Sequence, residues 1–215
     1  MKKLLTVAKA LIVAFGAVNA ASQDKKAMKY ATKQAKQEQK AGWKVDGVLT
    51  LEEVFYKYRL LLEQEGNAPL TGIVAGQNTT KTVNQAKQWA ITNAAITYAK
   101  EAGMDLRGRI AAGVNAGAGD IAPSDDSFFE AYEALVSKEI KGELKMNFGL
   151  YRETDHGVEY KAFYIVNEDK ASQARVRALE NLKKENEYAR LHAERLADFV
   201  REGFELRELE GELAK

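Results

Sequence analysis

The sequence predicts an α+β fold in which a small antiparallel sheet of three strands, or four with one further segment, carries helices on one face. Residues 144–152 alternate between apolar and polar side chains. Residues 158–166 follow after Thr154-Asp-His-Gly157, a connection that ends in glycine, so the two runs predict a β-hairpin. Residues 70–77 combine β-branched side chains with two glycines, and they lead into an alanine-rich helical segment at residues 81–102. Helical spacing elsewhere predicts long helices at both ends of the chain.

The first twenty residues have the composition of an export signal. Lys2 and Lys3 precede an apolar stretch at residues 4–18, and Val18-Asn19-Ala20 supplies small residues at the positions that a signal peptidase reads. We therefore expect cleavage at about Ala20/Ala21 and a periplasmic or outer-envelope location.

The alternative for this segment is a retained membrane anchor. The apolar stretch is shorter than the roughly 20 residues of a transmembrane helix, and Lys9 interrupts it. The full chain of 215 residues has a formal net charge of +1, and removal of residues 1–20 leaves 29 basic and 31 acidic residues, a charge of −2. Such a balance gives no reason to expect a nucleic-acid partner.

The rest of the chain divides into a helical leader at residues 21–48, a single α+β domain at 49–204 and a charged tail at 205–215. Three alanines in the leader recur every four residues and form a thin apolar stripe on a lysine-rich helix, for which Gly42 is a suitable C-terminal cap. Because alanine buries little area, we expect the leader to be solvated and partly frayed. The alternative is peripheral contact of its lysines with an anionic surface, either phospholipid headgroups or wall polymer.

Two helices are predicted in the first half of the domain. Thr50-Leu-Glu-Glu53 is a capping box, and the helix that it starts carries an aromatic-rich face for the core and ends by Gly66. The segment at 81–102 has alanines along one face, which permits close approach to a sheet. The apolar pattern resumes at 104–114, either as the same helix kinked at Gly103 or as a second helix.

Two more helices are predicted in the second half. Residues 124–127 cap a helix at 128–140, and residues 169–204 read as one long helix. This last helix is longer than a small sheet can cover, so we expect it to pair with another helix, either within the chain or in a homodimer.

The glycine-rich segments do not match phosphate-binding motifs. Gly72 and Gly76 are not followed by Gly-Lys-Ser/Thr, and they instead permit either β-bulges or close approach of another backbone. The run at 113–119 lacks the preceding strand and the spacing of a dinucleotide-binding fingerprint, and it predicts a loop.

The ionisable residues do not form a recognisable catalytic or metal-binding motif. The chain has no cysteine and two histidines, which excludes thiolate chemistry and nearly excludes a multi-histidine metal centre. Asp155-His156 has no nucleophile motif to complete a triad and predicts an exposed turn, and His192 is expected at the surface or partly buried. We therefore assign no catalytic, cofactor-binding or metal-binding residue, and we expect no enzymatic activity and no cofactor.

One enzymatic alternative remains. Asp125, Asp126 and Glu130 cluster next to the glycine-rich run, and two carboxyl groups could act as general acid and base of a hydrolase if one were buried. A second alternative is a small-ligand site between the alanine-rich helix and the sheet.

The export signal, the lysine-rich leader that ends Lys40-Ala-Gly-Trp-Lys-Val45, and the strand followed by an alanine-rich helix resemble the twenty-kilodalton-lipoprotein-like envelope domains of Gram-negative bacteria. The resemblance covers residues 25–202 as a pattern. It implies a non-enzymatic envelope or surface-appendage component, often lipid-anchored, but this chain lacks the cysteine that lipid anchoring requires. The function that we expect is an exported protein that binds or scaffolds an envelope protein or a cell-wall partner.

Overall fold

The computed structural model describes residues 24–115, 126–204 and 206. In these residues it has a four-stranded antiparallel sheet with the order β1-β3-β4-β2. The strands are β1 (Lys44–Val45), β2 (Asn67–Val74), β3 (Met146–Thr154) and β4 (Gly157–Asn167). The α+β class, the hairpin and the strand before the alanine-rich helix are confirmed. The fourth strand comes from the segment that links the leader to the domain.

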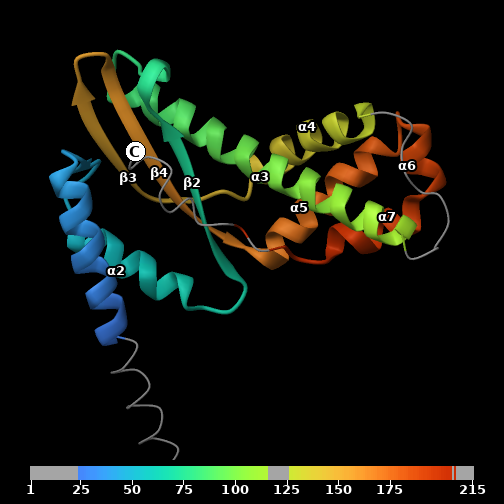
Figure 1. The fold of residues 1–215 in the computed structure, drawn as a ribbon, viewed down its shortest axis with the longest axis horizontal. Helices are drawn as coiled ribbons and strands as arrows, with labels where there is room; N and C mark the ends of the chain where they lie inside the picture. Colours follow the sequence, from blue (N-terminus) through green and yellow to red (C-terminus); the bar gives the residue numbers. More distant parts are fainter. Residues whose placement is uncertain (1–23, 116–125, 205, 207–215) are drawn as a thin grey trace, which may run out of the picture.

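Helices cover both faces of the sheet, so the expectation of helices on one face was wrong (Figure 1). An N-terminal helix at residues 24–40 and α2 (Leu51–Leu62) pack on one face. α3 (Val83–Asn115) packs on the other face and runs on into a bundle. The remaining helices of this bundle are α4 (Ser127–Lys141), α5 (Glu168–Leu182), α6 (Glu187–Leu191) and α7 (Ala193–Arg201).

A β-bulge explains how β3 serves both faces. The register with β4 shifts between Met146, which pairs with Tyr164, and Phe148, which pairs with Phe163. Met146 therefore packs against the α3 side, whereas Phe148 and Leu150 pack on the α2 side. The alternation from residue 144 to 152 predicted the strand, but the extra residue at Asn147 divides its apolar side chains between two cores.

An aromatic cluster fills the core under α2. Phe148 and Phe163 stack with ring centroids 4.4 Å apart, and the rings of Phe55 and Tyr58 contact both edge to face. The capping box predicted at Thr50 is present and starts this helix. Its aromatic face is thus part of the core, as the sequence predicted.

α3 lies in close contact with β2. A Cβ atom added at Gly72 would lie 1.9 Å from the carbonyl oxygen of Ala90 and 2.9 Å from the Cβ of Ala94. Ala86, Ala90 and Ala94 are fully buried along this contact. The small-residue face therefore brings the helix backbone against the strand, as predicted.

α3 continues as a single helix beyond the end of the sheet. At Gly103 a Cβ atom would lie 2.3 Å from Oε1 of Glu133 on α4, so the second half of α3 packs closely on its neighbour in the bundle. The alternative of two separate helices was wrong.

The C-terminal segment forms three helices instead of one. The chain leaves helical geometry after Lys183, and the side chain of Asn186 accepts a hydrogen bond from the amide of Ala189 to start α6. α7 then folds back, and Oγ of Ser172 on α5 donates to the carbonyl of Arg201 at 3.1 Å. The helix pairing that the length of the segment predicted is therefore present within the chain.

The N-terminal helix is docked, so the expectation of a solvated leader was wrong. Ala27 and Ala31 are fully buried, and Nζ of Lys161 lies 2.8 Å from both carboxylate oxygens of Glu38. The buried ring of Trp43 lies under the Lys161 ammonium group, at 4.4 Å from its centroid. The alanine stripe permits close approach, while the ion pair and the tryptophan supply contacts that the stripe alone lacks. Gly42 ends the helix with φ of +81°, as predicted.

Asp46 links β1 to α3 across the sheet. Its carboxylate accepts hydrogen bonds from Nζ of Lys87 at 2.9 Å and from the hydroxyl of Tyr160 at 2.7 Å. Tyr160 reaches this carboxylate because Gly149 leaves its path open, since a Cβ at Gly149 would lie 1.9 Å from the Tyr160 hydroxyl. Burial alone raises the pKa of Asp46, but the bonds from Lys87 and Tyr160 outweigh it and leave the pKa below its usual value.

A buried arginine joins the helices of the bundle. Arg175 on α5 is 2% exposed, and its guanidinium donates to the carbonyl of Val200 at 2.8 Å, to the hydroxyl of Tyr98 and to the carboxylate of Glu168. It also donates to the carbonyl of Glu202 at 3.2 Å, so it satisfies carbonyl groups at the C-terminal end of α7.

The first prediction concerns the contact of α3 with β2. Gly72→Ala is expected to lower the free energy of unfolding by about 1–3 kcal/mol, because the new Cβ would overlap backbone atoms of α3. Gly108→Ala, in α3, is the control, since nothing lies within 4 Å of a Cβ atom built at Gly108. It is expected to raise stability by about 0.5–1 kcal/mol. Urea unfolding of both variants checks the pair, and equal effects of the two would contradict the packing described above.

The second prediction concerns the buried tyrosines. Burial raises the pKa of Tyr98 to about 12 and also raises that of Tyr132. The unfolded chain deprotonates these groups near pH 10, so their contribution to stability is fully present below about pH 10 and is lost as the pH rises through the folded-state pKa.

Tyr132→Phe is expected to leave stability at pH 7 nearly unchanged, because its buried hydroxyl has no hydrogen-bond partner among the described residues. At pH 11 this variant should lose less stability than the natural chain. Tyr98→Phe removes an acceptor from Arg175 and should cost about 1–3 kcal/mol already at pH 7. Urea unfolding at both pH values distinguishes the two, and a large loss for Tyr132→Phe at pH 7 would contradict the assignment.

Candidate functional site

One edge of the sheet is long and is formed by β2. The strand order places β1 and β2 at the two edges, and β1 has two residues whereas β2 has eight. An edge strand presents backbone N–H and C=O groups that can pair with another strand. β2 is therefore the edge at which the described sheet could take a further strand.

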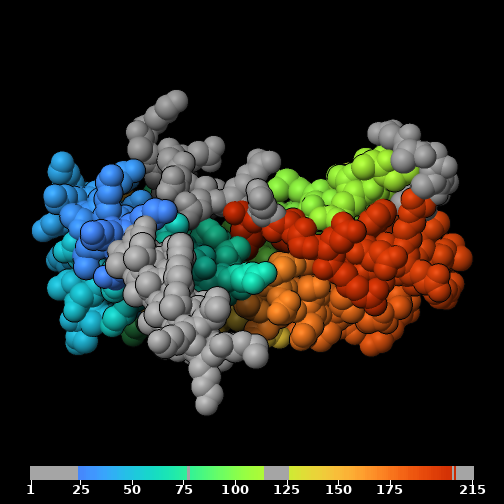
Figure 2. All heavy atoms as spheres, turned by 90° about the horizontal axis from the view of Figure 1, so that it is seen from below, coloured from blue at the N-terminus to red at the C-terminus, as the bar shows by residue number. Residues whose placement is uncertain are grey.

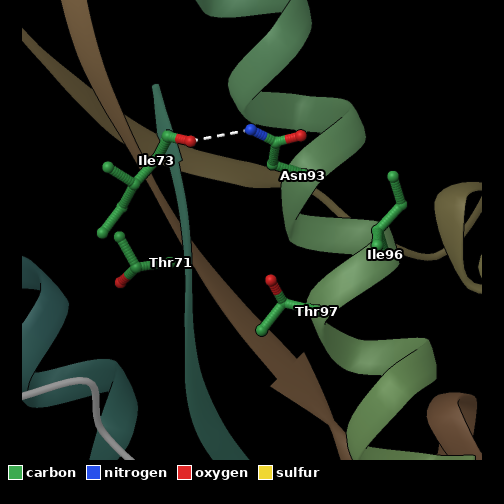
Figure 3. Close-up of a pocket in the computed structure, with 5 residues that line it drawn as sticks. All are labelled: Thr71, Ile73, Asn93, Ile96 and Thr97. Carbon is green, nitrogen blue, oxygen red and sulfur yellow. Dashed lines mark hydrogen bonds between the residues drawn. The ribbon is translucent and has the colours of Figure 1, made fainter. Parts of the chain in front are cut away.

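The backbone groups of Thr71 and Ile73 face the outer side of β2, where no other strand of the described residues pairs with them. Along an antiparallel pair, residues of one parity bond to the partner strand and those of the other parity point outward. Pro69 has no N–H to offer a ladder, and the Ile73 carbonyl accepts a hydrogen bond from Nδ2 of Asn93 on α3 at 2.8 Å (Figure 3). Both observations indicate that the backbone N–H and C=O positions of residues 69, 71 and 73 point away from β4.

A shallow groove lies between this edge and α3. Its volume is about 200 Å³, and it is lined by Thr71, Ile73, Asn93, Ile96 and Thr97. Figure 3 shows the side chains of Thr71 and Ile73 pointing away from α3, so the strand presents its backbone to the groove. The helix supplies the amide of Asn93 and the aliphatic side chain of Ile96, which is 40% exposed.

The groove continues into an exposed apolar stripe on α3. Successive helix residues are about 100° apart, so Trp89, Ile96 and Met104 project from one side of the helix. They are 48%, 40% and 63% exposed, respectively. The buried alanines occupy the opposite arc, which is why the bulky residues of this helix remain in solvent.

The groove is small, and the residues that line it offer no ionisable side chain. Its volume is below the roughly 300–1,000 Å³ of sites for small molecules. Outward backbone groups next to an apolar stripe suit an extended peptide, which would bond through its own backbone and place alternate side chains on the helix.

The carboxylate cluster suggested by the sequence is not a buried pair in the described residues. Asp126 is exposed and lies 2.6 Å from a guanidinium nitrogen of Arg107, and Glu130 is also exposed. Asp126 precedes α4 without a side-chain capping bond. Of the glycine-rich run at 113–119, residues 113–115 are the last residues of α3, so the expectation of a loop was wrong for them, and residues 116–119 and Asp125 lie outside the described residues. The burial that a general acid would need is absent at Asp126 and Glu130.

The two histidines are where the sequence placed them. Asp155 and His156 form the exposed turn between β3 and β4, and the His156 carbonyl accepts a hydrogen bond from Oγ1 of Thr79 at 2.6 Å. His192 is partly buried between α6 and α7, with its ring 4.7 Å from that of Tyr188. The two residues are thus parts of a turn and of a helix junction.

Within the described ranges, no group of three or more histidine, aspartate or glutamate side chains is arranged to hold a metal ion. In the same residues, no helix combines the length and the apolar character that crossing a membrane requires.

Sequence reasoning identified the strand and the helix that form the groove, but not the residues that define it. Asn93 and Ile96 lie within an alanine-rich segment whose dominant pattern is the buried face. The available signal was the spacing of Trp89, Ile96 and Met104, which recur at intervals of seven and eight residues and therefore lie on a different side of the helix from most of the alanines.

Comparison of the chain with protein-family models, curated proteins and solved structures finds no match.

The third prediction tests the assignment of the free edge. Asn93→Ala should lower the free energy of unfolding by about 0.5–1.5 kcal/mol, because it removes the hydrogen bond to the Ile73 carbonyl while water can replace part of it. Thr97→Ala, in the same groove and without a hydrogen bond to β2, is the control and should change stability by less than about 0.5 kcal/mol. Thermal unfolding measures both, and indistinguishable costs would contradict the assignment.

Proposed function

We propose that this protein is an exported, non-enzymatic binding protein of the cell envelope, and that it recognises its partner as an extended peptide segment added to the free edge of β2. The observation that carries the proposal is the edge itself. Thr71 presents its outward N–H and C=O groups, and Ile73 its outward N–H, next to the exposed side chain of Ile96, while the Ile73 carbonyl is bound by Asn93.

Export is supported by the N-terminal sequence. Lys2, Lys3 and the apolar stretch at 4–18 have the order of a signal peptide. The resemblance to envelope domains of Gram-negative bacteria points to the same compartment. A chain without cysteine can fold there without forming disulfides.

A peptide is favoured over a small molecule by the shape of the groove. It is open, small and lined on one side by backbone, so it would leave most of a compact ligand in solvent. An extended chain instead uses the hydrogen-bonding direction of the strand and also covers the stripe on α3. A scaffold that binds the ends or linkers of other envelope proteins would work in this way.

The fourth prediction is a peptide-binding experiment. We expect selection from a random library of unstructured twelve-residue peptides on the purified chain 21–215 to enrich sequences with alternating apolar residues, which would contact α3. Thr71→Pro removes the N–H of Thr71, which points away from β4 as the ring nitrogen of Pro69 does. The substitution should weaken the binding of an enriched peptide at least about tenfold. Ile96→Lys should do the same by removing apolar contact.

Leu191→Lys is the matched control, because Leu191 is 70% exposed on α6 and remote in sequence from the groove. It should leave the affinity unchanged, and circular dichroism should show the same fold in all three variants. Failure to enrich any peptide, or binding that Thr71→Pro leaves intact, would contradict strand addition at β2.

A further inference from the structure

We infer that the N-terminal helix is a docking surface for a bilayer that contains anionic phospholipid. This inference goes beyond peptide binding and rests on the proposed envelope location, which brings the protein next to such bilayers. The helix at residues 24–40 carries six lysines against one aspartate and one glutamate. Figure 2 shows it in blue at the outer surface of the end of the molecule remote from the bundle.

The lysines gather on one face of this helix. With about 100° between successive residues, all six project within an arc of about 100°. All six are exposed, and they are Lys25, Lys26, Lys29, Lys33, Lys36 and Lys40. The buried Ala27 and Ala31 lie on the opposite side of the helix, so docking against the domain leaves the charged face outward.

The acidic residues of the helix do not neutralise this face. The hydroxyl of Tyr56 donates to Asp24, and Glu38 is 8% exposed and bound to Lys161 of β4. In the described part of the chain, none of the six lysines forms an ion pair, whereas Lys87, Lys161 and Lys183 do. A solvated helix would gain stability from Glu–Lys pairs four residues apart, and this helix has none. Its positive charge is therefore available for a partner.

Contacts with α2 orient the lysine face relative to the rest of the domain. Thr32 forms a hydrogen bond with Glu52 of α2, and Asp24 forms one with Tyr56 of the same helix. The guanidinium of Arg59 lies over the ring of Tyr30, 5.6 Å from its centroid. Both ends of the helix are thus attached to the rest of the protein, and a contact made by the lysines orients the whole domain.

Charge complementarity and the composition of the face favour a lipid surface over nucleic acid. Tyr30, the one aromatic residue of the helix, is partly buried and lies outside the lysine arc, so the face has no platform on which bases could stack. Met28 flanks the arc and is 47% exposed, as is suitable for shallow insertion among headgroups. Long lysine side chains reach headgroup phosphates while the helix axis stays parallel to the bilayer.

The test is co-sedimentation of the chain 21–215 with vesicles. We expect binding to vesicles of equimolar phosphatidylglycerol and phosphatidylcholine, no binding to phosphatidylcholine alone, and weaker binding as salt is raised. A lysine near an anionic surface contributes about fivefold in affinity. The combined variant Lys29→Glu, Lys33→Glu and Lys36→Glu should therefore bind at least about 100-fold more weakly.

The matched control changes the same net charge elsewhere. Lys81→Glu, Lys145→Glu and Lys170→Glu together alter exposed lysines outside the helix and should keep most of the vesicle binding. Equal loss in the two triple variants, or no binding to anionic vesicles, would overturn the inference. So would binding to soluble polyphosphate with none to vesicles, which would favour a polymer as the partner. Peptide selection does not depend on lipid, so this inference can fail while strand addition at β2 stands.

Discussion

The close contact of α3 with β2 is the constraint on which the rest of the structure depends. Gly72 and the alanines opposite it allow the two backbones to approach to a distance that any side chain at residue 72 would prevent. The helix therefore lies flat on one face of the sheet, and it extends past the sheet to start the bundle. The same geometry leaves its bulky residues Trp89 and Ile96 exposed, and Ile96 lines the groove beside β2. The close packing of the small residues of α3 on β2 thus leaves the larger residues of this helix at the surface that we propose as the binding site.

The two proposed surfaces belong to different elements, and both elements are attached to the same sheet. The groove lies at β2, and the lysine face is carried by a helix that is bound to β4 through Glu38 and Lys161. A domain that contacts a bilayer through one face and a peptide through another would present its partner at a set orientation to the membrane. The buried Arg175 belongs to neither surface. Its hydrogen bonds to the carbonyl groups of Val200 and Glu202 attach α5 to the end of α7 within the bundle.

Much of the secondary structure could be predicted because its signals are local. The capping box at Thr50, the cap at Gly42 and the hairpin around residues 155–156 each depend on neighbours a few residues away, and each is present. The bulge at Asn147 could not be predicted, because an unbroken alternation reads the same whether or not one residue slips. The break before Asn186 was hidden for a similar reason, since the helical spacing continues through it. Of the candidate site, sequence reasoning reached the strand and the helix but not Asn93.

By itself the sequence determined the class of the fold, the pairing of β3 with β4, the small-residue face of α3 and the lysine-rich composition of the N-terminal helix. These properties follow from spacing and residue type, which act within a few residues. Only the tertiary structure decided that helices cover both faces, that the leader docks through Glu38 and Lys161, and that β2 lies at an edge of the described sheet. Each of these depends on which distant segments meet, such as residues 38 and 161. Contacts of that range are selected by burial and charge pairing over the whole chain, and no local pattern encodes them.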